Sequence, residues 1–401
     1  MLNKNVLITS VLVYAAATLT SFWFFTKNAD FASSLANYRI LNNETNTNTT
    51  TTKTGTNGDS AAAEAAAKEP KTEECPINGA MYGKTQRQRW ETRRPLGVMI
   101  ENHTEARPQS GLSSADVIYE AVAEGGITRF LSVFYCQDAP YLGPIRSARI
   151  YFLKLLQGYG EYPLYAHVGG ANTDGPADAL GEIVDIGWSQ YNDLNQFSVS
   201  FPTFYRDYDR LPDRATEHTV YSSTSKLWDY AAAKRKLTNV DEKGVKWDKT
   251  FKKWTFKDDA KPEDRGTTAK IDFGFWTQFV SDYGVVWNYD KASNSYSRTN
   301  GGKPHLDKNN GKPITSKNVV VVFAKESVAN DGYEAGQHLL YKIIGTGDAL
   351  IFQDGKVIKG GWSKKSEEDP MIFSDASGKE APLVRGKVFV EILPLDNKVT
   401  Y

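Results

Sequence analysis

Short apolar runs alternate with polar turns along most of the chain after residue 90. Between residues 90 and 236, runs of the length of a buried strand are separated by longer stretches with helical periodicity. We therefore predict an α/β domain over residues 90–236. Its expected strands are Leu96–Ile100, Val117–Val122, Phe130–Tyr135 and Leu164–Val168, and its expected helices are Ile150–Leu156 and Asp178–Val184.

From residue 269 to residue 396 the apolar runs remain short, but turn signals separate them instead of helical stretches. Asn310-Gly311 and Asp354-Gly355 are typical of tight turns between antiparallel strands. We predict a β-rich C-terminal domain, so that the folded chain as a whole is a mixed α/β protein. Its expected strands are Val285–Tyr289, Tyr296–Arg298, Val319–Phe323, Leu339–Ile344, Ala349–Phe352 and Val388–Leu393.

An uncharged apolar run, Val6–Phe25, is about long enough to cross the ~30 Å hydrocarbon core of a membrane as a helix. A cleaved signal peptide usually has a shorter apolar core and small residues at its cleavage site, whereas this run ends in bulky aromatic residues. We predict an uncleaved transmembrane anchor, with residues 1–5 as a cytoplasmic tail; cleavage is the open alternative. The expected location is the cell membrane, crossed once, with the folded domains on the extracytoplasmic side.

Residues 42–74 contain no aromatic and almost no large aliphatic side chain. Such a segment cannot bury enough apolar surface to offset the entropy of ordering its backbone. We predict a disordered linker between the anchor and the folded domains.

Charge composition limits the partners of the protein. The 401 residues include 48 Lys and Arg and 48 Asp and Glu, which gives a formal net charge of zero. Affinity for nucleic acid depends on a basic surface, so a nucleic-acid binder is not expected. The two cysteines, Cys75 and Cys136, are too few for a disulfide scaffold or a four-cysteine zinc site. A disulfide between them and a free buried pair both remain open.

The common catalytic motifs are absent from the sequence. There is no H-E-x-x-H, no phosphate-binding P-loop and no G-x-S-x-G. The five histidines show no spacing typical of metal ligands. We therefore predict neither a metal site nor a cofactor.

Charged side chains gather instead around Gly143-Pro-Ile-Arg-Ser-Ala-Arg149, a turn that leads into an apolar helix. Helix amides and guanidinium groups together are suited to a phosphate or a carboxylate. In the structural alternative, Arg146 and Arg149 form buried ion pairs with Asp116, Glu120 or Glu124 that only lock the fold. The anion-site hypothesis comprises Arg107, Arg129, Arg146, Ser147, Arg149 and Arg206, supported by the polar residues Glu101, Asn102, Asp116, Glu120, Glu124 and His167.

Several long segments resemble the YerB-like DUF3048 family of bacterial envelope proteins. They are RPLGVMIENHTEARPQSGLSSADVIYEAVAEGGITRFLSVFY, GPIRSARIYF and AHVGG and, for the C-terminal domain of that family, VVWNYDKASNSYSR, HLDKNNGKPITSKNVVVVF, GTGDALIFQDGKVIKGGWSKKS and VFVEILP. The resemblance implies an N-terminal three-layer α/β domain followed by a β-rich domain. Members resemble lipoproteins outside the cytoplasmic membrane, whereas this chain lacks the lipobox cysteine and carries the apolar run at 6–25 instead.

The resemblance brings no established reaction, so two hypotheses follow from the residues. In the first, the protein is a non-catalytic envelope module that binds an anionic wall component or a wall-synthesis protein. In the second, it is an enzyme that handles phosphoryl groups or glycopolymers. There the arginines neutralise developing phosphate charge, and Glu101 or Asp116 acts as base or metal ligand.

Overall fold

The computed structural model describes residues 69–333 and 338–401. The predicted cytoplasmic tail (1–5), the predicted membrane anchor (6–25) and the predicted linker as far as residue 68 lie outside the described residues. Within the described ranges, no helix is long and apolar enough to cross a membrane.

The last residues of the predicted linker are folded. Strand β1 (Glu73–Glu74) pairs with β2 (Met81–Tyr82) in an antiparallel hairpin. Glu73 forms an ion pair with Arg87 at 2.5 Å, and Glu74 forms one with Lys253 at 2.9 Å. These contacts order residues whose composition alone predicts disorder.

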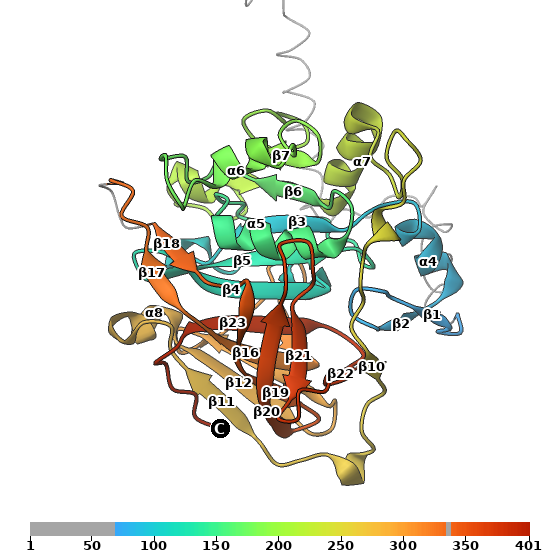
Figure 1. Ribbon diagram of the computed structural model, residues 1–401, viewed down its shortest axis with the longest axis vertical. Coiled ribbons are helices and arrows are strands. Elements are labelled where there is room, and N and C mark those ends of the chain that lie inside the picture. The colour runs from blue at the N-terminus through green and yellow to red at the C-terminus, as the bar shows by residue number, and fades with distance from the viewer. Residues whose placement is uncertain (1–68, 334–337) are drawn as a thin grey trace, which may run out of the picture. The chain divides into compact units, whose positions relative to one another are not determined.

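A ten-stranded sheet runs through the centre of the fold, in the order β21-β20-β19-β16-β23-β4-β5-β3-β6-β7 (Figure 1). Both regions predicted from the sequence contribute strands to it. The last strand of the chain, β23, pairs in parallel with β16 on one side and with β4 on the other. The strands are β3 (Leu96–Glu101), β4 (Val117–Glu124), β5 (Ile127–Phe134), β6 (Leu164–His167), β7 (Asp193–Asn195), β16 (Asn318–Ala324), β19 (Gly345–Gln353), β20 (Lys356–Lys364), β21 (Ile372–Asp375) and β23 (Val388–Pro394).

Helices cover one face of this sheet. In α5 (Ile150–Leu156) every residue except Lys154 is buried, which explains why the segment is almost continuously apolar. The methyl groups of Leu156 lie against Gly97 of β3, where a Cβ would clash at 2.7 Å. The other helices are α4 (Lys84–Trp90), α6 (Ala179–Asp185), α7 (Thr224–Arg235) and α8 (Val280–Tyr283). Asp178 caps α6 and Ser223 caps α7 through their side chains.

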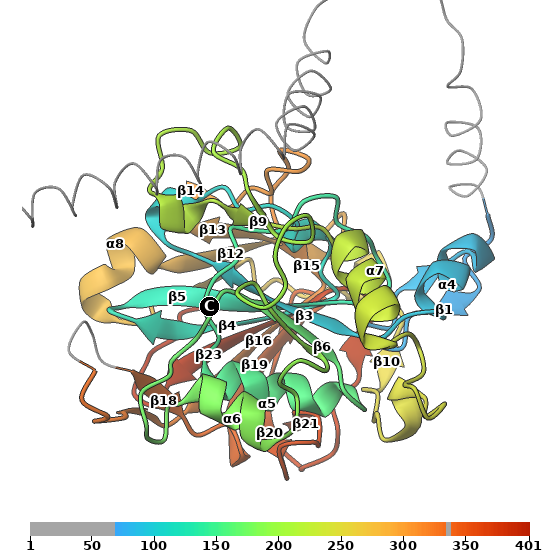
Figure 2. The same ribbon diagram turned by 90° about the horizontal axis from the view of Figure 1, so that it is seen from above.

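A second, antiparallel sheet covers the opposite face, so the layers run helix, large sheet, small sheet (Figure 2). The Trp287 ring packs edge-on against Phe389 of β23, with the ring centroids 5.0 Å apart. The mixed α/β class predicted from the sequence is confirmed. The second sheet, which packs against the strands of the N-terminal region, is formed by the C-terminal region. The strands of the second sheet are β11 (Lys270–Phe273), β12 (Val285–Asp290), β13 (Ser295–Asn300), β14 (Lys303–Pro304) and β15 (Thr315–Ser316).

Besides the β1–β2 hairpin, six further short strands in the described residues form pairs outside these two sheets: β8 (Tyr205–Arg206) with β9 (Val220–Tyr221), β10 (Phe256–Lys257) with β22 (Leu383–Val384), and β17 (Glu326–Val328) with β18 (Leu339–Tyr341). The structure joins Cys75 and Cys136 in a disulfide, which fastens the segment after β1 to the end of β5.

Candidate functional site

Charged residues gather at one edge of the large sheet because several strands end there. β3 is parallel to β6 and antiparallel to β5, and β5 is antiparallel to β4, so β3, β4 and β6 run in the same direction. Their last residues, Glu101, Glu124 and His167, therefore lie along a common edge. Ligands of open α/β sheets bind outside the carboxyl ends of strands, which makes this edge the first place to examine.

Arg129 and Arg149 share one carboxylate at this edge. Arg129 Nη2 donates to Glu124 Oε1 at 2.8 Å, and Arg149 Nη2 donates to Glu124 Oε2. Both arginines are buried, at 2% and 6% exposure, and the Nε of each makes no hydrogen bond with a described residue. Burial lowers the pKa of both guanidinium groups, yet arginine keeps its proton in proteins.

Glu101 connects a third arginine to a histidine. Its Oε1 accepts from Arg146 Nε at 3.1 Å, and its Oε2 lies 2.9 Å from His218 Nδ1. The hydrogen bond to Glu101 raises the pKa of His218. The Arg146 side chain is 28% exposed, and its two Nη groups make no hydrogen bond with the part of the chain that the structure describes.

These residues form one cluster because the sheet register brings them together. Arg129 is the direct cross-strand partner of Glu101, and directly paired residues point to the same face. We call Glu101, Glu124, Arg129, Arg146 and Arg149 the arginine edge. It holds three arginines and two carboxylates, so it carries one positive charge that no contacting carboxylate balances.

A different cluster lies on the opposite face of the large sheet, built from β4, β23 and β13 of the second sheet. Arg298 Nη2 donates to Glu120 Oε2, and Arg298 Nε lies 3.6 Å from Glu391 Oε1. All three side chains are fully buried between the two sheets. We call Glu120, Arg298 and Glu391 the buried lock.

Neutral polar groups surround the buried lock. Asn102 Nδ2 donates to Glu120 Oε1 at 3.1 Å, and His305 bridges Arg298 and Gln109 through its two ring nitrogens. Burial, together with the charges of Arg298 and Arg107, lowers the pKa of His305 well below its ordinary value. Burial and the neighbouring Glu120 raise the pKa of Glu391 well above its ordinary value. The lock therefore contains one arginine and two glutamates, and its environment favours the protonated form of Glu391.

Arg107 lies outside the arginine edge. It donates to the backbone oxygen and Oδ1 of Asn102, both at 2.9 Å, and to the backbone oxygen of Asp282 at 2.7 Å. With Arg214 and Lys303 it lines a cavity of about 380 Å³. The residue is therefore next to a basic cavity, while its own donors are engaged by neutral oxygens.

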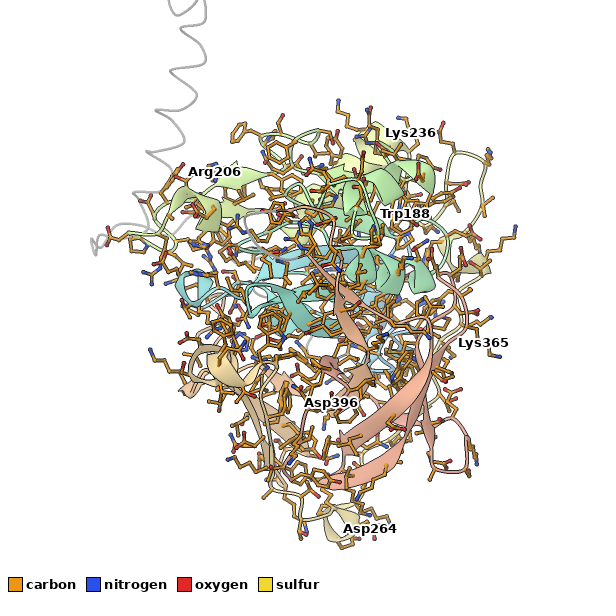
Figure 3. The ribbon with its side chains drawn as sticks, turned by 60° about the vertical axis from the view of Figure 1, so that its left-hand side comes forward. Trp188, Arg206, Lys236, Asp264, Lys365 and Asp396 are labelled. Atoms are coloured by element: carbon orange, nitrogen blue, oxygen red, sulfur yellow. A yellow bond between two sulfur atoms is a disulfide. The ribbon has the colours of Figure 1, made fainter. Side chains whose placement is uncertain are left out.

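Four other predicted site residues do not belong to the arginine edge, and one of them, Arg206, is labelled in Figure 3. Asp116 is fully buried beside the disulfide, where it accepts from Asn78 Nδ2 at 2.8 Å and from the backbone nitrogens of Tyr135 and Cys136. Burial raises the pKa of Asp116 to about 6. His167 is buried against Asp193 at 2.6 Å, and the exposed Arg206 donates to Thr216 O. Ser147 offers Arg129 its backbone oxygen at 3.0 Å, in place of the expected hydroxyl.

The structure thus divides the predicted set. Arg149 forms the ion pair with Glu124 that the structural alternative predicts, and Arg129 shares that carboxylate, whereas Arg146 pairs with Glu101. Asp116 and Glu120 do not contact them, because Asp116 lies beside the disulfide and Glu120 points to the opposite face of the sheet. Arg146 keeps an accessible guanidinium end. Asp116, whose oxygens already accept three hydrogen bonds out of solvent, does not meet the requirement for a base in the enzymatic hypothesis.

The sequence did not point to Arg298, Glu391 or the pairing of His103 with His218. The two imidazole rings stack with centroids 4.8 Å apart at 11°. The histidines come from segments far apart in the chain, so no local spacing could reveal them. The only local signal is His103-Thr-Glu105 directly after the first strand of the large sheet.

The fold and the arginine edge describe a strand-rich α/β protein with a large central sheet and a polar cluster at the carboxyl ends of its strands. The chain matches the family described as "Protein of unknown function (DUF3048) N-terminal domain" over residues 82–238, and the corresponding C-terminal domain over residues 276–390. The chain therefore belongs to the DUF3048 family, which confirms the resemblance seen in the sequence.

Two comparisons agree with this assignment. The chain is 32% identical over 320 residues to the "Putative lipoprotein YerB" of Bacillus subtilis (strain 168), which covers 79% of this chain and 86% of the relative. It also resembles the crystal structure of the YerB protein from Bacillus subtilis, with a TM-score of 0.65 and 27% identity. That match covers 82% of this chain and all of the solved chain.

Proposed function

We propose that the protein is a non-catalytic module of the cell envelope that binds an anionic wall component, or a wall-synthesis protein that presents such a group. The relative named as a lipoprotein supports an envelope location outside the cytoplasmic membrane. The apolar run at 6–25 supports attachment of this chain to the membrane by an anchor.

The charge balance of the arginine edge carries the proposal. Burial favours the protonated form of a carboxyl group, as it does for Glu391, whereas a guanidinium does not give up its proton. Three arginines over two carboxylates therefore remain one anion short. An anion from outside the chain removes this imbalance, and the exposed end of Arg146 is where it can enter.

The geometry favours an oxygen-rich ligand such as a phosphate. The two free Nη groups of Arg146 form a planar fork, which matches two oxygens of a phosphate or carboxylate. Phosphate groups of a wall polymer and of a lipid-linked pyrophosphate offer the same recognition chemistry. We therefore expect inorganic pyrophosphate to serve as a minimal probe of the site.

The test is a titration of the full-length protein, kept in detergent, with inorganic pyrophosphate and with an anionic wall polymer, measured by calorimetry. Arg146→Ala should weaken binding by about tenfold or more, since a charge-assisted hydrogen bond contributes about 1.5–3 kcal/mol. Arg89→Ala is the matched control, because the Arg89 side chain is also accessible, at 60% exposure, and also forms an ion pair with a carboxylate, that of Asp138. Equal affinity of Arg146→Ala and the unmodified protein, or no binding of either probe, would overturn the proposal.

A further inference from the structure

His103, Glu105 and His218 place one ligand atom each within 4.8 Å of one another near the arginine edge. We propose that these three side chains bind a divalent transition-metal ion of the zinc type. This site is separate from the proposed anion function, because it uses other side chains and can be tested with the metal alone.

Two short segments position the three residues. His103 precedes the 3₁₀ helix Thr104–Ala106 and accepts a hydrogen bond from the backbone nitrogen of Glu105 at its Nδ1. His218 is the last residue of a second 3₁₀ helix, Thr216–His218. The site therefore joins the end of β3 to a loop that precedes β9, which no local sequence pattern connects.

The donor set has the chemistry that zinc prefers. Two imidazole nitrogens and one carboxylate oxygen are a common three-ligand set for zinc, with a fourth position left for water or a ligand. His218 Nε2 lies 3.6 Å from Glu105 Oε2. A tetrahedral zinc ion with bonds of about 2.0–2.1 Å holds its ligand atoms about 3.3–3.5 Å apart, so this pair is already close to the required spacing.

Glu101 provides the outer support that metal-binding histidines usually have. Its Oε2 lies 2.9 Å from His218 Nδ1 and accepts the proton on that nitrogen. A carboxylate on one imidazole nitrogen fixes the ring and leaves the lone pair of the other nitrogen free for a metal. The free nitrogen is Nε2, the atom that faces Glu105.

One movement completes the site. The His103 and His218 rings are nearly parallel, so their in-plane lone pairs do not converge on a single point. His103 is only partly buried and has room to turn, and ligation through either of its nitrogens replaces its hydrogen bond with Glu105 N. Metal binding should therefore unstack the two rings.

Another cluster of possible ligands gives a useful contrast. Cys75, Asp116 and Cys136 also bring their ligand atoms together, but the two sulfurs are joined in a disulfide and Asp116 is engaged by three donors. In the histidine cluster, by contrast, His218 Nε2 and the Glu105 carboxylate face each other, and the one bond to be replaced is that of His103 with Glu105 N.

The test is calorimetry of the full-length protein, stripped with a chelator and titrated with Zn²⁺, with Co²⁺ absorption as a readout of coordination geometry. We expect one site, a tetrahedral Co²⁺ spectrum, and no comparable binding of Mg²⁺. Glu105→Gln and His103→Ala should each lower the Zn²⁺ affinity at least about tenfold, and Glu101→Gln should lower it about 10–100-fold through the lost outer support. Glu105 is about half exposed, so its substitution leaves the fold intact.

His338→Ala is the matched control, because His338 also pairs with a carboxylate, that of Asp331, at 2.7 Å. Its Zn²⁺ affinity should equal that of the unmodified protein. Absence of Zn²⁺ binding, or unchanged affinity in both Glu105→Gln and His103→Ala with unchanged melting temperatures, would overturn the metal site. Arg146→Ala should retain the metal, so failure of the anion proposal and failure of the metal proposal give different results.

Discussion

The buried lock and the arginine edge use the same two residue types on opposite faces of the same sheet. The lock holds two glutamates and one arginine, and all three are fully buried. The edge holds two glutamates and three arginines, and Arg146 keeps part of its guanidinium in contact with solvent. The lock therefore has one more glutamate than arginine, and the edge has one more arginine than glutamate.

This difference shows why the excess charge of the lock is neutralised within the protein, whereas the excess charge of the edge is not. An excess carboxylate becomes neutral by binding a proton, which is what burial and Glu120 impose on Glu391. An excess arginine has no such option. The lock therefore needs no ligand, whereas the edge is where we propose that an anion binds.

The largest effect is expected when the lock is broken. Arg298→Met leaves the Glu120 carboxylate buried without its cation, and this should lower the free energy of unfolding by about 3–5 kcal/mol. Urea denaturation followed by tryptophan fluorescence measures it. Arg87→Met is the control, because Arg87 is 55% exposed and solvent screens its ion pairs, so its loss should change the stability little. Similar losses in both variants would show that the lock does not stabilise the fold.

An intermediate effect is expected at Glu124. Glu124→Gln removes the carboxylate that Arg129 and Arg149 share, but the Glu124 side chain is 30% exposed, so the expected loss is about 1–3 kcal/mol. The variant lacks the Glu124 carboxylate in addition to the anion that we propose for the arginine edge. Inorganic phosphate should therefore raise the stability of the variant more than that of the unmodified protein. Thermal melts with and without phosphate measure this. Glu91→Gln, at an exposed ion pair, should show neither the loss nor the recovery.

The pH dependence of the lock should change when Glu391 is replaced. The raised pKa means that folded Glu391 keeps its proton above its ordinary value of 4.5, so its contribution to stability is lost as the pH rises through that window. Glu391→Gln keeps a neutral side chain and an oxygen for Trp287 Nε1. The variant should equal the unmodified protein near pH 4.5 and be the more stable of the two at pH 8 in urea denaturation. A constant difference between the two pH values would contradict a neutral Glu391.

The smallest effect is expected at Arg146. Its ion pair with Glu101 is partly exposed, and Glu101 retains His218, so Arg146→Ala should change the free energy of unfolding by less than about 1 kcal/mol. The same denaturation assay applies. A loss as large as that of Glu124→Gln would show that Arg146 stabilises the fold and is not available to bind a ligand.

Local structure was predictable from the sequence where a segment is apolar on every side. The predicted helix Ile150–Leu156 has the bounds of α5, and the predicted strand Leu96–Ile100 ends one residue before β3 does. Such segments are buried whatever surrounds them, so their own composition determines them. Arg298 is the opposite case. Its neighbours in sequence are those of an exposed hairpin, and only the packing of one sheet on another buries it.

The partners of the charged groups could not be predicted either, because they also depend on how segments distant in sequence pack together. The arginines around residue 146 indicated a polar site, and the structure places Arg129, Arg146 and Arg149 in ion pairs with Glu124 and Glu101. Which carboxylate each contacts depends on strand register: Glu101 and Arg129 are direct partners, while Glu120 faces the other way. A change of one residue in register would exchange these faces, and the apolar pattern of a strand buried on both sides does not fix the register.

The position of β23 has a consequence for how the chain folds. This strand ends at Pro394, near the C-terminus, yet it separates β16 from β4 in the middle of the large sheet. While the chain is being made from its N-terminus, the edge of β4 that β23 will occupy stays unpaired until almost the last residues have emerged. Contacts so distant in sequence form slowly, and until they form, the unpaired edge of β4 can pair with a strand of another chain. A chain truncated before residue 388 would lose this central strand, and its large sheet would be divided in two.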